Sequence, residues 1–322
     1  MKKNKKKKSV FKSFFTLLIL ISIVFGIIFG MRVHENGGGV QGLLLTTLGA
    51  NKVELEQLDT LYILVLGVST DLQKELTDTI ILCGYNPKTN QAMMLSIPRD
   101  TFVGTDKNNA KGSEKINCLY SKGVQKTVTA VEEITGVDID YYAVVNTQAL
   151  TEIVDVIGGV EFNVPINMKY DDPTQNLHIN LNKGVQMIEG KEAEMLLRFR
   201  HNNDGTSYPA EYVDNDYGRL RTQREFIKAT ISEIIQLKNI TKIKPLLNTI
   251  FENLDTNLTV DDAIPYIPYL VGIDLDNIIT KQLPGNSELC NNIWIYINDK
   301  SKTKKLMGEI INTIEHGIIK VQ

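Results

Sequence analysis

Apolar runs of strand length recur after residue 60 and alternate with segments of helical periodicity. The run LYILVLGV, residues 61–68, is apolar throughout, as expected of a strand buried on both faces. Residues 77–86 and 91–98 have the composition of strands and are joined by PKTN, which predicts a β-hairpin. Because helical segments separate the later strands, the sequence predicts an α/β fold, a three-layer α/β/α domain with a central mixed sheet.

Shorter strands are expected at residues 141–146 and 160–164. Helices are expected where apolar residues recur every three or four positions, over residues 124–134, 147–157, 189–197, 219–237, 243–254, 260–270 and 301–314. Residues 241–322 contain no motif that indicates a function.

The N-terminus combines a basic head with a long uncharged segment. Six lysines lie within the first eight residues, and residues 13–31 carry no charged side chain. Nineteen residues in a helix span roughly 28 Å, close to the thickness of a hydrocarbon core, and exceed the usual apolar length of a cleaved signal peptide. We therefore expect a single-pass anchor in the cell membrane at 13–31, with a cytoplasmic head at 1–12. A spacer at 32–58 and an extracellular catalytic domain at 59–322 would follow.

The charge of the remaining chain is strongly acidic. Eight of the 35 basic residues precede Val33 and none of the 38 acidic residues does, which leaves the rest of the chain with a net charge of −11. A nucleic-acid-binding domain usually presents a basic face, so we expect no nucleic-acid partner. With three cysteines and four scattered histidines, neither a disulfide framework nor a zinc site is expected.

One stretch, residues 198–224, is locally basic and contains five arginines. Guanidinium groups are planar, forked donors that match phosphate oxygens, so several of them beside a helix start indicate a site for a multiply charged anion such as pyrophosphate. The alternative is a solvated, charge-rich loop, because surface charges contribute little by themselves.

Spacing suggests how these side chains could converge. If Arg198 and Arg200 end a strand, they share one face. If a helix begins near Asp216, Arg219 and Gln223 are four residues apart and also share one face. Two arginines from one element and an arginine and a glutamine from another could then bind the same anion.

Carboxylates near the first hairpin suggest a cation site. Asp71 and Asp78 could hold one Mg²⁺, a hard cation that prefers a few carboxylates plus phosphate oxygens. Ordinary turn chemistry is the alternative, since Asp is common in loops. Arg99 follows the expected strand 91–98, at the kind of strand end where sites of α/β proteins gather, although a surface salt bridge would explain it equally well.

Taken in order, these segments resemble the LytR–CpsA–Psr family of membrane-anchored cell-wall enzymes. The matching stretches span roughly residues 60–240 and read LYILVLGV, LTDTIILCGYNPKT, LSIPRDTFV, KINCLYSKG, VVNTQALTEIVDVIGGVEFNVP, LNKGVQMIEGKEAEMLLRFR and DYGRLRTQREFI. The resemblance is specific because several motifs recur together.

The resemblance implies a membrane-anchored phosphotransferase. Such enzymes move a glycopolymer, for example teichoic acid or capsule, from a polyprenyl-pyrophosphate carrier to a muramic-acid hydroxyl of peptidoglycan, assisted by Mg²⁺ (or Mn²⁺). The expected partners are the lipid-linked glycopolymer, peptidoglycan and the lipid bilayer, on the outer face of a Gram-positive-type envelope. A hydrolase of lipid-linked glycans, or a non-catalytic lipid-glycan-binding envelope regulator, are the alternatives.

The resemblance also assigns residues to this chemistry. Pyrophosphate contacts fall on Arg99, Lys115, Arg198, Arg200, Arg219 and Gln223. Asp78 matches a Mg²⁺ ligand, and Asp71 is a second candidate ligand. The candidate catalytic residues are Arg99, Asp100, Asp216 and Arg219, with Asp100 and Asp216 as candidate general bases.

The sequence departs from the family pattern at two positions. The family usually has Asp after the first strand where this chain has Ser69, and often has Arg where it has Leu76. One metal ligand and one pyrophosphate contact are therefore replaced, with Asp71 as the candidate substitute for the missing acid.

Overall fold

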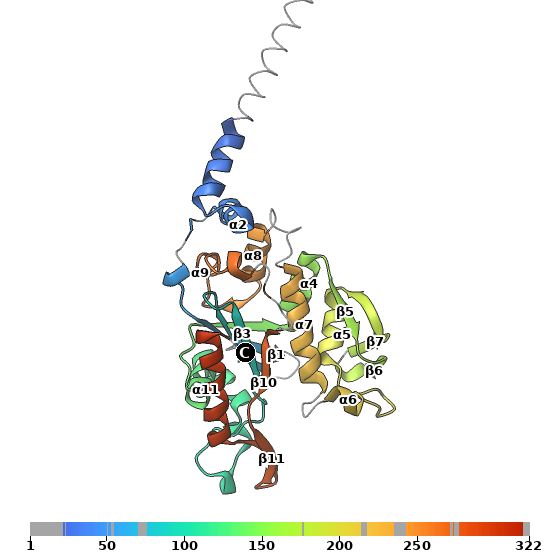
Figure 1. Cartoon of the computed structure of the whole chain (residues 1–322). Coiled ribbons are helices and arrows are strands. Elements are labelled where there is room, and N and C mark those ends of the chain that lie inside the picture. Colours follow the sequence, from blue (N-terminus) through green and yellow to red (C-terminus); the bar gives the residue numbers. More distant parts are fainter. Residues whose placement is uncertain are drawn as a thin grey trace, which may run out of the picture.

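The computed structural model describes residues 22, 24–49, 51–52, 55–69, 76–175, 177–213, 218–234, 243–270, 273 and 277–317 (Figure 1). Its centre is a six-stranded mixed sheet with the strand order β10 (Ile279–Gln282), β3 (Gln91–Ser96), β2 (Leu76–Asn86), β1 (Leu61–Ser69), β4 (Tyr141–Asn146) and β9 (Asp255–Thr256). The α/β class with a central mixed sheet is confirmed, and so is the hairpin, as β2 and β3.

The strand directions gather several chain segments at one edge of the sheet. β1 runs parallel to β4, and β2 runs antiparallel to both of its neighbours, β1 and β3. The start of β2 therefore lies beside the ends of β1 and β3. At this edge Gly67 has no room for a side chain, because a Cβ there would lie 2.9 Å from the Cβ of Thr79. A glycine thus allows β1 to approach the strand that carries Asp78.

Two helices cover one face of the sheet, α3 (Val124–Thr135) and α11 (Lys300–His316). Their buried residues follow helical spacing, with Val128 and Val131 in α3 and Met307 and Ile310 in α11. They pack with the buried strand residues Leu64, Leu66, Leu82, Met93 and Leu95 into one core, which we call the sheet core.

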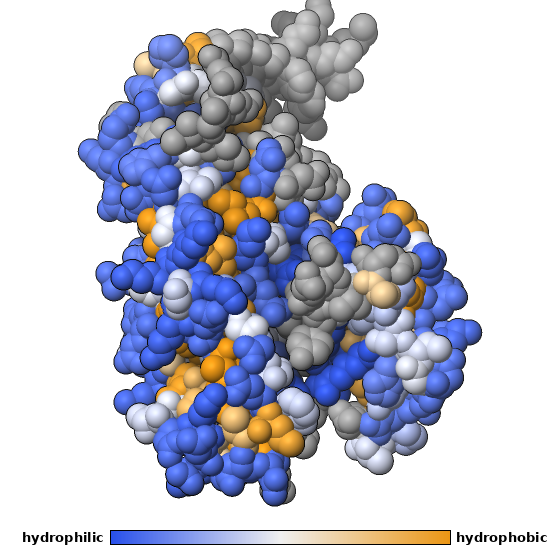
Figure 2. All heavy atoms as spheres, turned by 60° about the horizontal axis from the view of Figure 1, so that its bottom comes forward, coloured by the Kyte–Doolittle hydropathy of each residue, from blue (hydrophilic) through white to orange (hydrophobic). Residues whose placement is uncertain are grey.

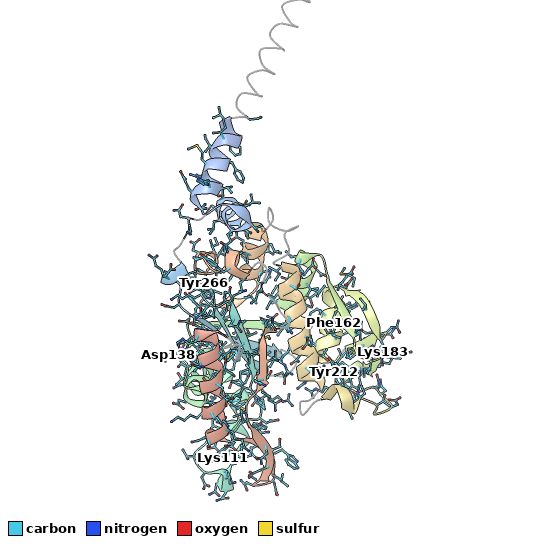
Figure 3. The ribbon with its side chains drawn as sticks, in the orientation of Figure 1. Lys111, Asp138, Phe162, Lys183, Tyr212 and Tyr266 are labelled. Carbon is cyan, nitrogen blue, oxygen red and sulfur yellow. The ribbon has the colours of Figure 1, made fainter. Side chains whose placement is uncertain are left out.

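The opposite side of the sheet carries the helices α4 (Thr147–Ile157) and α7 (Gly218–Ile234) and a separate lobe (Figure 1). The lobe contains α5 (Gly190–Arg198) and the strand pairs β5 (Val160–Val164) with β8 (Gly184–Ile188) and β6 (Met168–Asp172) with β7 (Leu177–Leu181). Its buried residues form a second cluster, the lobe core, which includes Phe162 (labelled in Figure 3) and Phe226, and the two rings are in edge-to-face contact.

The remaining elements lie at the two ends of the molecule. Near the N-terminal end are α2 (Gly39–Leu48), α8 (Ile243–Glu252), α9 (Val260–Ala263) and α10 (Ile267–Leu270), and α6 (Ala210–Val213) lies beside the lobe. At the far end, β11 (Gly285–Cys290) and β12 (Ile293–Asn298) form a hairpin. Short 3₁₀ turns occupy Leu55–Gln57, Lys107–Asn109, Gly112–Glu114, Ile116–Cys118, Tyr120–Lys122 and Pro173–Gln175.

Some expected elements differ from the structure. The helix expected at 260–270 is two short helices, because Pro265 and Pro268 lack the amide donor that a continuous helix needs. Part of the segment expected as a spacer is the helix α2, whose Leu44 and Leu48 are buried against Leu247. The helix expected at 219–237 is present as α7.

The N-terminal anchor stays a prediction. Residues 1–21 and 23, which include the basic head and much of the 13–31 segment, lie outside the described residues. Within the described part of the chain, no helix has the length and apolar character needed to cross a membrane. Residues 24–35 are helical, and Phe25 and Met31 on this helix are exposed.

Candidate functional site

Guanidinium groups from three separate segments meet at the sheet edge formed by the start of β2. Arg99 follows β3, Arg200 follows α5, and Arg219 lies in the first turn of α7. Burial lowers the pKa of Arg219 to about 10, and the positive charges of Arg200 and Arg99 contribute in the same direction, while Asp78 opposes them. Because the positive charges of Arg200 and Arg99 disfavour the Arg219 cation, this cluster suits an anion with several negative oxygens.

Asp78 is the acidic member of the cluster. It lies on β2 and forms an ion pair with the Nη1 atom of Arg99. Both side chains are about one-third exposed, which leaves them accessible from solvent. The antiparallel pairing of β2 and β3 brings these residues together, although they are 21 positions apart in sequence.

The segment that carries Arg99 and Asp100 is held on both sides by backbone hydrogen bonds. On one side, the amide of Tyr296 in β12 donates to the carbonyl of Asp100 at 2.9 Å, and the amide of Phe102 donates to the carbonyl of Tyr296 at 2.9 Å. On the other side, the amide of Asn117 donates to the carbonyl of Arg99 at 3.2 Å. The site segment is thus the middle member of a small three-segment ladder.

Lys115 contacts the site through Asp100. Its ammonium group lies 2.8 Å from Oδ1 of Asp100, and Nε of Arg99 lies 4.0 Å from Oδ2 of the same carboxylate. Asp100 therefore lies between two cations. A lysine in this position neutralises the carboxylate and is also close enough to the arginine cluster to add to its positive potential.

Gln223 and Arg224 connect α7 to the sheet. Gln223 accepts a hydrogen bond from the hydroxyl of Thr79 at 3.0 Å and donates to the carbonyl of Leu197 at 3.2 Å. Arg224 is buried and donates to the hydroxyl of Ser96 at 3.2 Å. Gln223 of α7 therefore links β2 to α5. Its partner on β2, Thr79, is the residue after Asp78, so this link holds α7 and its Arg219 against the sheet beside Asp78.

The helix expected at 189–197 is present as α5 and ends at Arg198, so the conditional arrangement of Arg198 and Arg200 at a strand end does not apply. The chain leaves that helix with Phe199 in an extended conformation and fully buried, so the two arginines flank an apolar anchor. Arg198 forms an ion pair with Glu194 of its own helix at 2.8 Å. Arg200 is the member of the pair that interacts with Arg219.

Arg221 illustrates the other face of α7. It lies over the ring of Tyr212 with 4.5 Å between the guanidinium carbon and the ring centroid, and it donates to the carbonyl of Tyr212 at 2.9 Å (Figure 3). It is two positions after Arg219 in the helix, so helical geometry directs the two side chains away from each other. Of the five arginines in this stretch, Arg200 and Arg219 therefore belong to the cluster, while Arg198, Arg221 and Arg224 have partners elsewhere in the fold.

The two departures from the family pattern lie opposite each other. Ser69 is paired with Leu76 in the ladder between β1 and β2, at the same sheet edge as Asp78. The family pattern has an acid at one of these positions and often a base at the other. Their joint replacement therefore removes one charge of each sign, and leaves the net charge of the edge unchanged.

The described residues supply one carboxylate for a cation in the arginine cluster. Among them, no group of three or more acidic, histidine or cysteine side chains could hold a metal ion. Asp71 and Asp216 lie outside the described residues. Mg²⁺ is commonly held by one or two carboxylates plus substrate phosphates, so Asp78 fits such an ion only in company with phosphate oxygens.

The shape of the surface is consistent with a site between the sheet and the lobe. Figure 2 shows a hollow between the part of the molecule that contains the sheet and the lobe, with strongly hydrophilic residues along it. Three contacts that were not predicted from the sequence support the site: the bond from Arg224 to Ser96, the bond from Thr79 to Gln223, and the backbone bonds of Tyr296. The first two lie within stretches of the family pattern, whereas Tyr296 is almost 200 residues from Arg99 and carried no signal.

The fold and the site together define an α/β protein with a cluster of guanidinium groups around one carboxylate at the edge of its sheet. Residues 45–312 match the model of the LytR_cpsA_psr family, and the chain belongs to this family.

Several relatives have names that describe an activity. The polyisoprenyl-teichoic acid–peptidoglycan teichoic acid transferase TagU of Bacillus licheniformis is 31% identical over 263 residues, which cover 80% of this chain and 79% of that protein. Biofilm regulatory protein A of Streptococcus mutans is 30% identical over 240 residues, 69% of this chain and 56% of that protein. The crystal structure of B. subtilis TagV matches with a TM-score of 0.67 and 25% identity, covering 80% of this chain and 98% of that one.

Proposed function

We propose that this protein is a transferase that attaches a glycopolymer from a polyprenyl-pyrophosphate carrier to peptidoglycan. The observation that supports it most directly is the convergence of Arg99, Arg200 and Arg219 around Asp78. The names of the relatives agree, since TagU proteins are described as transferring teichoic acid to peptidoglycan. An acidic chain that concentrates arginines at one sheet edge is suited to a local, phosphorylated ligand.

The chemistry is displacement at phosphorus. A sugar hydroxyl of the acceptor attacks the phosphorus next to the glycan, a new P–O bond forms, and the bond to the lipid phosphate breaks. The hydroxyl proton leaves, and the lipid phosphate departs with the electron pair of the broken bond. Such reactions are accelerated mainly by positioning and by neutralising charge on the non-bridging and leaving oxygens. Arg99, Arg200 and Arg219 would supply that neutralisation, because their guanidinium groups are in place before the substrate binds.

Two carboxylates have proposed roles in the same step. Asp78, with Asp71 as a second candidate, would hold a divalent cation whose charge adds to that of the arginines at the phosphate oxygens. Asp100 is the candidate general base within the described residues, with Asp216 the other candidate. The ammonium group of Lys115 donates to Oδ1 of Asp100 at 2.8 Å, which would orient the carboxylate and leave Oδ2 to accept the hydroxyl proton.

We also propose that the protein is anchored in the membrane by residues 13–31, with the domain outside the cell. The basic head and the uncharged segment support this, and so do the exposed apolar side chains on the helix formed by residues 24–35. Such an anchor would hold the site near a lipid-linked donor.

The test is a transfer assay with the full chain in detergent. A synthetic polyprenyl-pyrophosphate-linked saccharide and uncrosslinked peptidoglycan are supplied with Mg²⁺ and then with a chelator, and Arg99→Ala is the site control. We expect saccharide on peptidoglycan only with Mg²⁺, and much less with Arg99→Ala. Release of phosphorylated saccharide without attachment would instead show a hydrolase. Tight donor binding without any product would show a non-catalytic binder.

A further inference from the structure

The hairpin of β11 and β12 presents two large apolar side chains to solvent. Leu289 and Trp294 are 58% and 61% exposed, and they are directly opposite each other in the antiparallel ladder. Single exposed apolar residues are common on protein surfaces, but a cross-strand pair forms a continuous flat surface. We call these two side chains the hairpin platform.

The platform is connected to the candidate site by the strand β12 itself. Tyr296 lies two residues after Trp294, which is about 7 Å along a strand. The backbone of Tyr296 is hydrogen-bonded to Asp100 and Phe102, on either side of Thr101. A molecule bound at the platform would therefore lie close to the segment that carries Arg99 and Asp100.

The hairpin is held in place before any ligand binds. The side chain of Asn291 donates to the carbonyl of Ala110 at 3.1 Å, and Lys107 forms an ion pair with Glu288 at 2.9 Å. At the base of the hairpin the hydroxyl of Tyr296 donates to the carbonyl of Leu283 at 2.6 Å. These bonds tie the hairpin to the 106–111 loop and to the sheet, so the platform is preorganised.

The chemistry around the platform favours a sugar chain over a phosphate-rich one. Residues 285–298 contain no basic side chain, and Glu288 is already paired with Lys107. A polyanionic donor would instead be drawn to the arginine cluster. An indole ring with a neighbouring leucine offers a flat apolar surface for the C–H faces of sugar rings, and the exposed Ser287, on the same strand face as Leu289, offers a polar group for hydroxyls.

The position of the hairpin argues against a lipid surface as the occupant. In Figure 1 the hairpin lies at the end of the molecule opposite the helix formed by residues 24–35, and Lys111 of the adjoining loop marks the same end in Figure 3. We propose that the hairpin platform binds the glycan chain of the acceptor, peptidoglycan, and presents its hydroxyl to the site. This inference rests on the proposed function, because it assigns the acceptor subsite of that reaction.

The experiment uses the fact that Trp294 is the only tryptophan of the chain. Its fluorescence therefore reports on the platform directly. The full chain, in a detergent without a sugar headgroup, is titrated with soluble uncrosslinked peptidoglycan strands, and separately with inorganic pyrophosphate. We expect a blue shift with the strands and none with pyrophosphate, because the glycan would cover the indole and pyrophosphate would bind at the arginines. No shift with the strands would overturn the proposal.

Variants separate the platform from the transfer reaction. Sedimentation with insoluble peptidoglycan measures binding and requires no turnover. Trp294→Ala or Leu289→Ala should weaken this binding by about five- to tenfold, as expected for a central aromatic or aliphatic contact. Trp294→Phe should retain most of the binding. Met187→Ala, an equally exposed apolar position on β8, is the matched control and should change nothing.

Each outcome has a meaning. Three results would overturn the proposal that the platform binds glycan. The wild-type protein could fail to sediment, or the variants could sediment as well as the wild type. The third is a Trp294→Ala effect confined to self-association or vesicle binding. Platform-dependent sedimentation by a protein that transfers no saccharide would support the platform and contradict the proposed transferase. In an active enzyme, Trp294→Ala should raise the KM for peptidoglycan and leave the KM for the donor unchanged.

Discussion

Arg219 is a cation in a place that disfavours positive charge. Burial and the neighbouring guanidinium groups of Arg200 and Arg99 lower its pKa to about 10. At pH 6–9 it is still protonated in both the folded and the unfolded chain, so it adds no pH dependence there. Above about pH 10 the folded protein loses the Arg219 proton while the unfolded chain still holds it. The free energy of unfolding would therefore rise with pH in that range. The folded protein thus carries a cost that a bound anion relieves.

Replacement of Arg219 by glutamine should stabilise the free protein while it weakens the site. We expect Arg219→Gln to raise the free energy of unfolding by roughly 1 kcal/mol, which corresponds to a few degrees in Tm. Pyrophosphate should raise the Tm of the wild type and have little effect on the variant. Thermal unfolding with and without pyrophosphate measures both.

Arg221→Gln is the matched control on the same helix. It removes the contact with Tyr212 and should lower stability by about 1 kcal/mol without changing the pyrophosphate effect. A lower Tm for Arg219→Gln than for the wild type would contradict the view that its charge is unfavourable in the free protein.

Asp78 should act in opposite directions on anion binding and on turnover. Asp78→Asn removes the negative charge beside Arg99, so the affinity for pyrophosphate without metal should increase several-fold. Mg²⁺-dependent transfer should decrease by about tenfold or more, because the carboxylate proposed to hold the cation is lost. Calorimetric titration and the transfer rate test the two parts.

Asp138→Asn, an exposed acid remote from the site, should leave both quantities unchanged (Figure 3). If Asp78→Asn reduced pyrophosphate affinity in the absence of metal, Asp78 would instead be a support for Arg99, holding the guanidinium in place.

At the scale of elements, the strand β12 determines where the Arg99 segment lies. Tyr296 supplies two backbone bonds to that segment and anchors its own ring through Leu283. Tyr296→Phe keeps the ring and removes one buried hydrogen bond, so it should reduce the free energy of unfolding by about 1 kcal/mol. Urea unfolding measures this change. Leu289→Ala, at an exposed position of the same hairpin, should stay within about 0.5 kcal/mol of wild type, and a change as small as this in Tyr296→Phe would show that the hydroxyl contributes nothing.

Periodicity predicted the central strands and most helices because these elements bury one continuous or regularly spaced apolar face. The run 61–68 is β1, and the helices expected at 124–134 and 147–157 are α3 and α4 within one residue at each end. The hairpin of β6 and β7 was not predicted, since its strands alternate over only five residues each and the turns between them are polar. Two prolines broke a helix that hydrophobic spacing alone had joined.

The candidate site was predictable only in part. The motif residues Arg99, Asp78, Arg200 and Arg219 come together, but sequence spacing could not show that Arg198 pairs with Glu194 while Arg200 faces the cluster. That difference depends on where α5 ends and on the buried Phe199. The contribution of Tyr296 could not be found at all, because it acts through its backbone, and backbone hydrogen bonds leave no mark on residue type.

At the scale of the whole molecule, the site joins two hydrophobic cores. Arg99 and Asp78 extend from the sheet core, and Arg200 extends from the lobe core. The helix α7 belongs to both parts, since Phe226 is buried in the lobe core while Gln223 and Arg224 bond to β2 and β3. An anion bound between these groups would therefore hold the two cores together.

Hydrogen exchange should detect this coupling. Pyrophosphate is expected to slow amide exchange in α7 and in residues 99–102 together, because both would be fixed by the same ligand. Mass spectrometry of peptides that cover residues 218–234 and 96–103 is the measurement. Arg219→Gln is the control and should lose the protection in both peptides. Protection limited to one peptide would contradict binding across the two cores.

The ladder around the Arg99 segment also has a consequence for biosynthesis. Every arginine of the cluster has been made by residue 219, yet the strand that completes the ladder, β12, begins only at residue 293. A nascent or prematurely terminated chain would hold all of its phosphate-binding side chains while the backbone beneath Arg99 and Asp100 lacked its final partner. Translation of β12 therefore supplies the last backbone support of the Arg99 segment, well after its phosphate-binding side chains have been made.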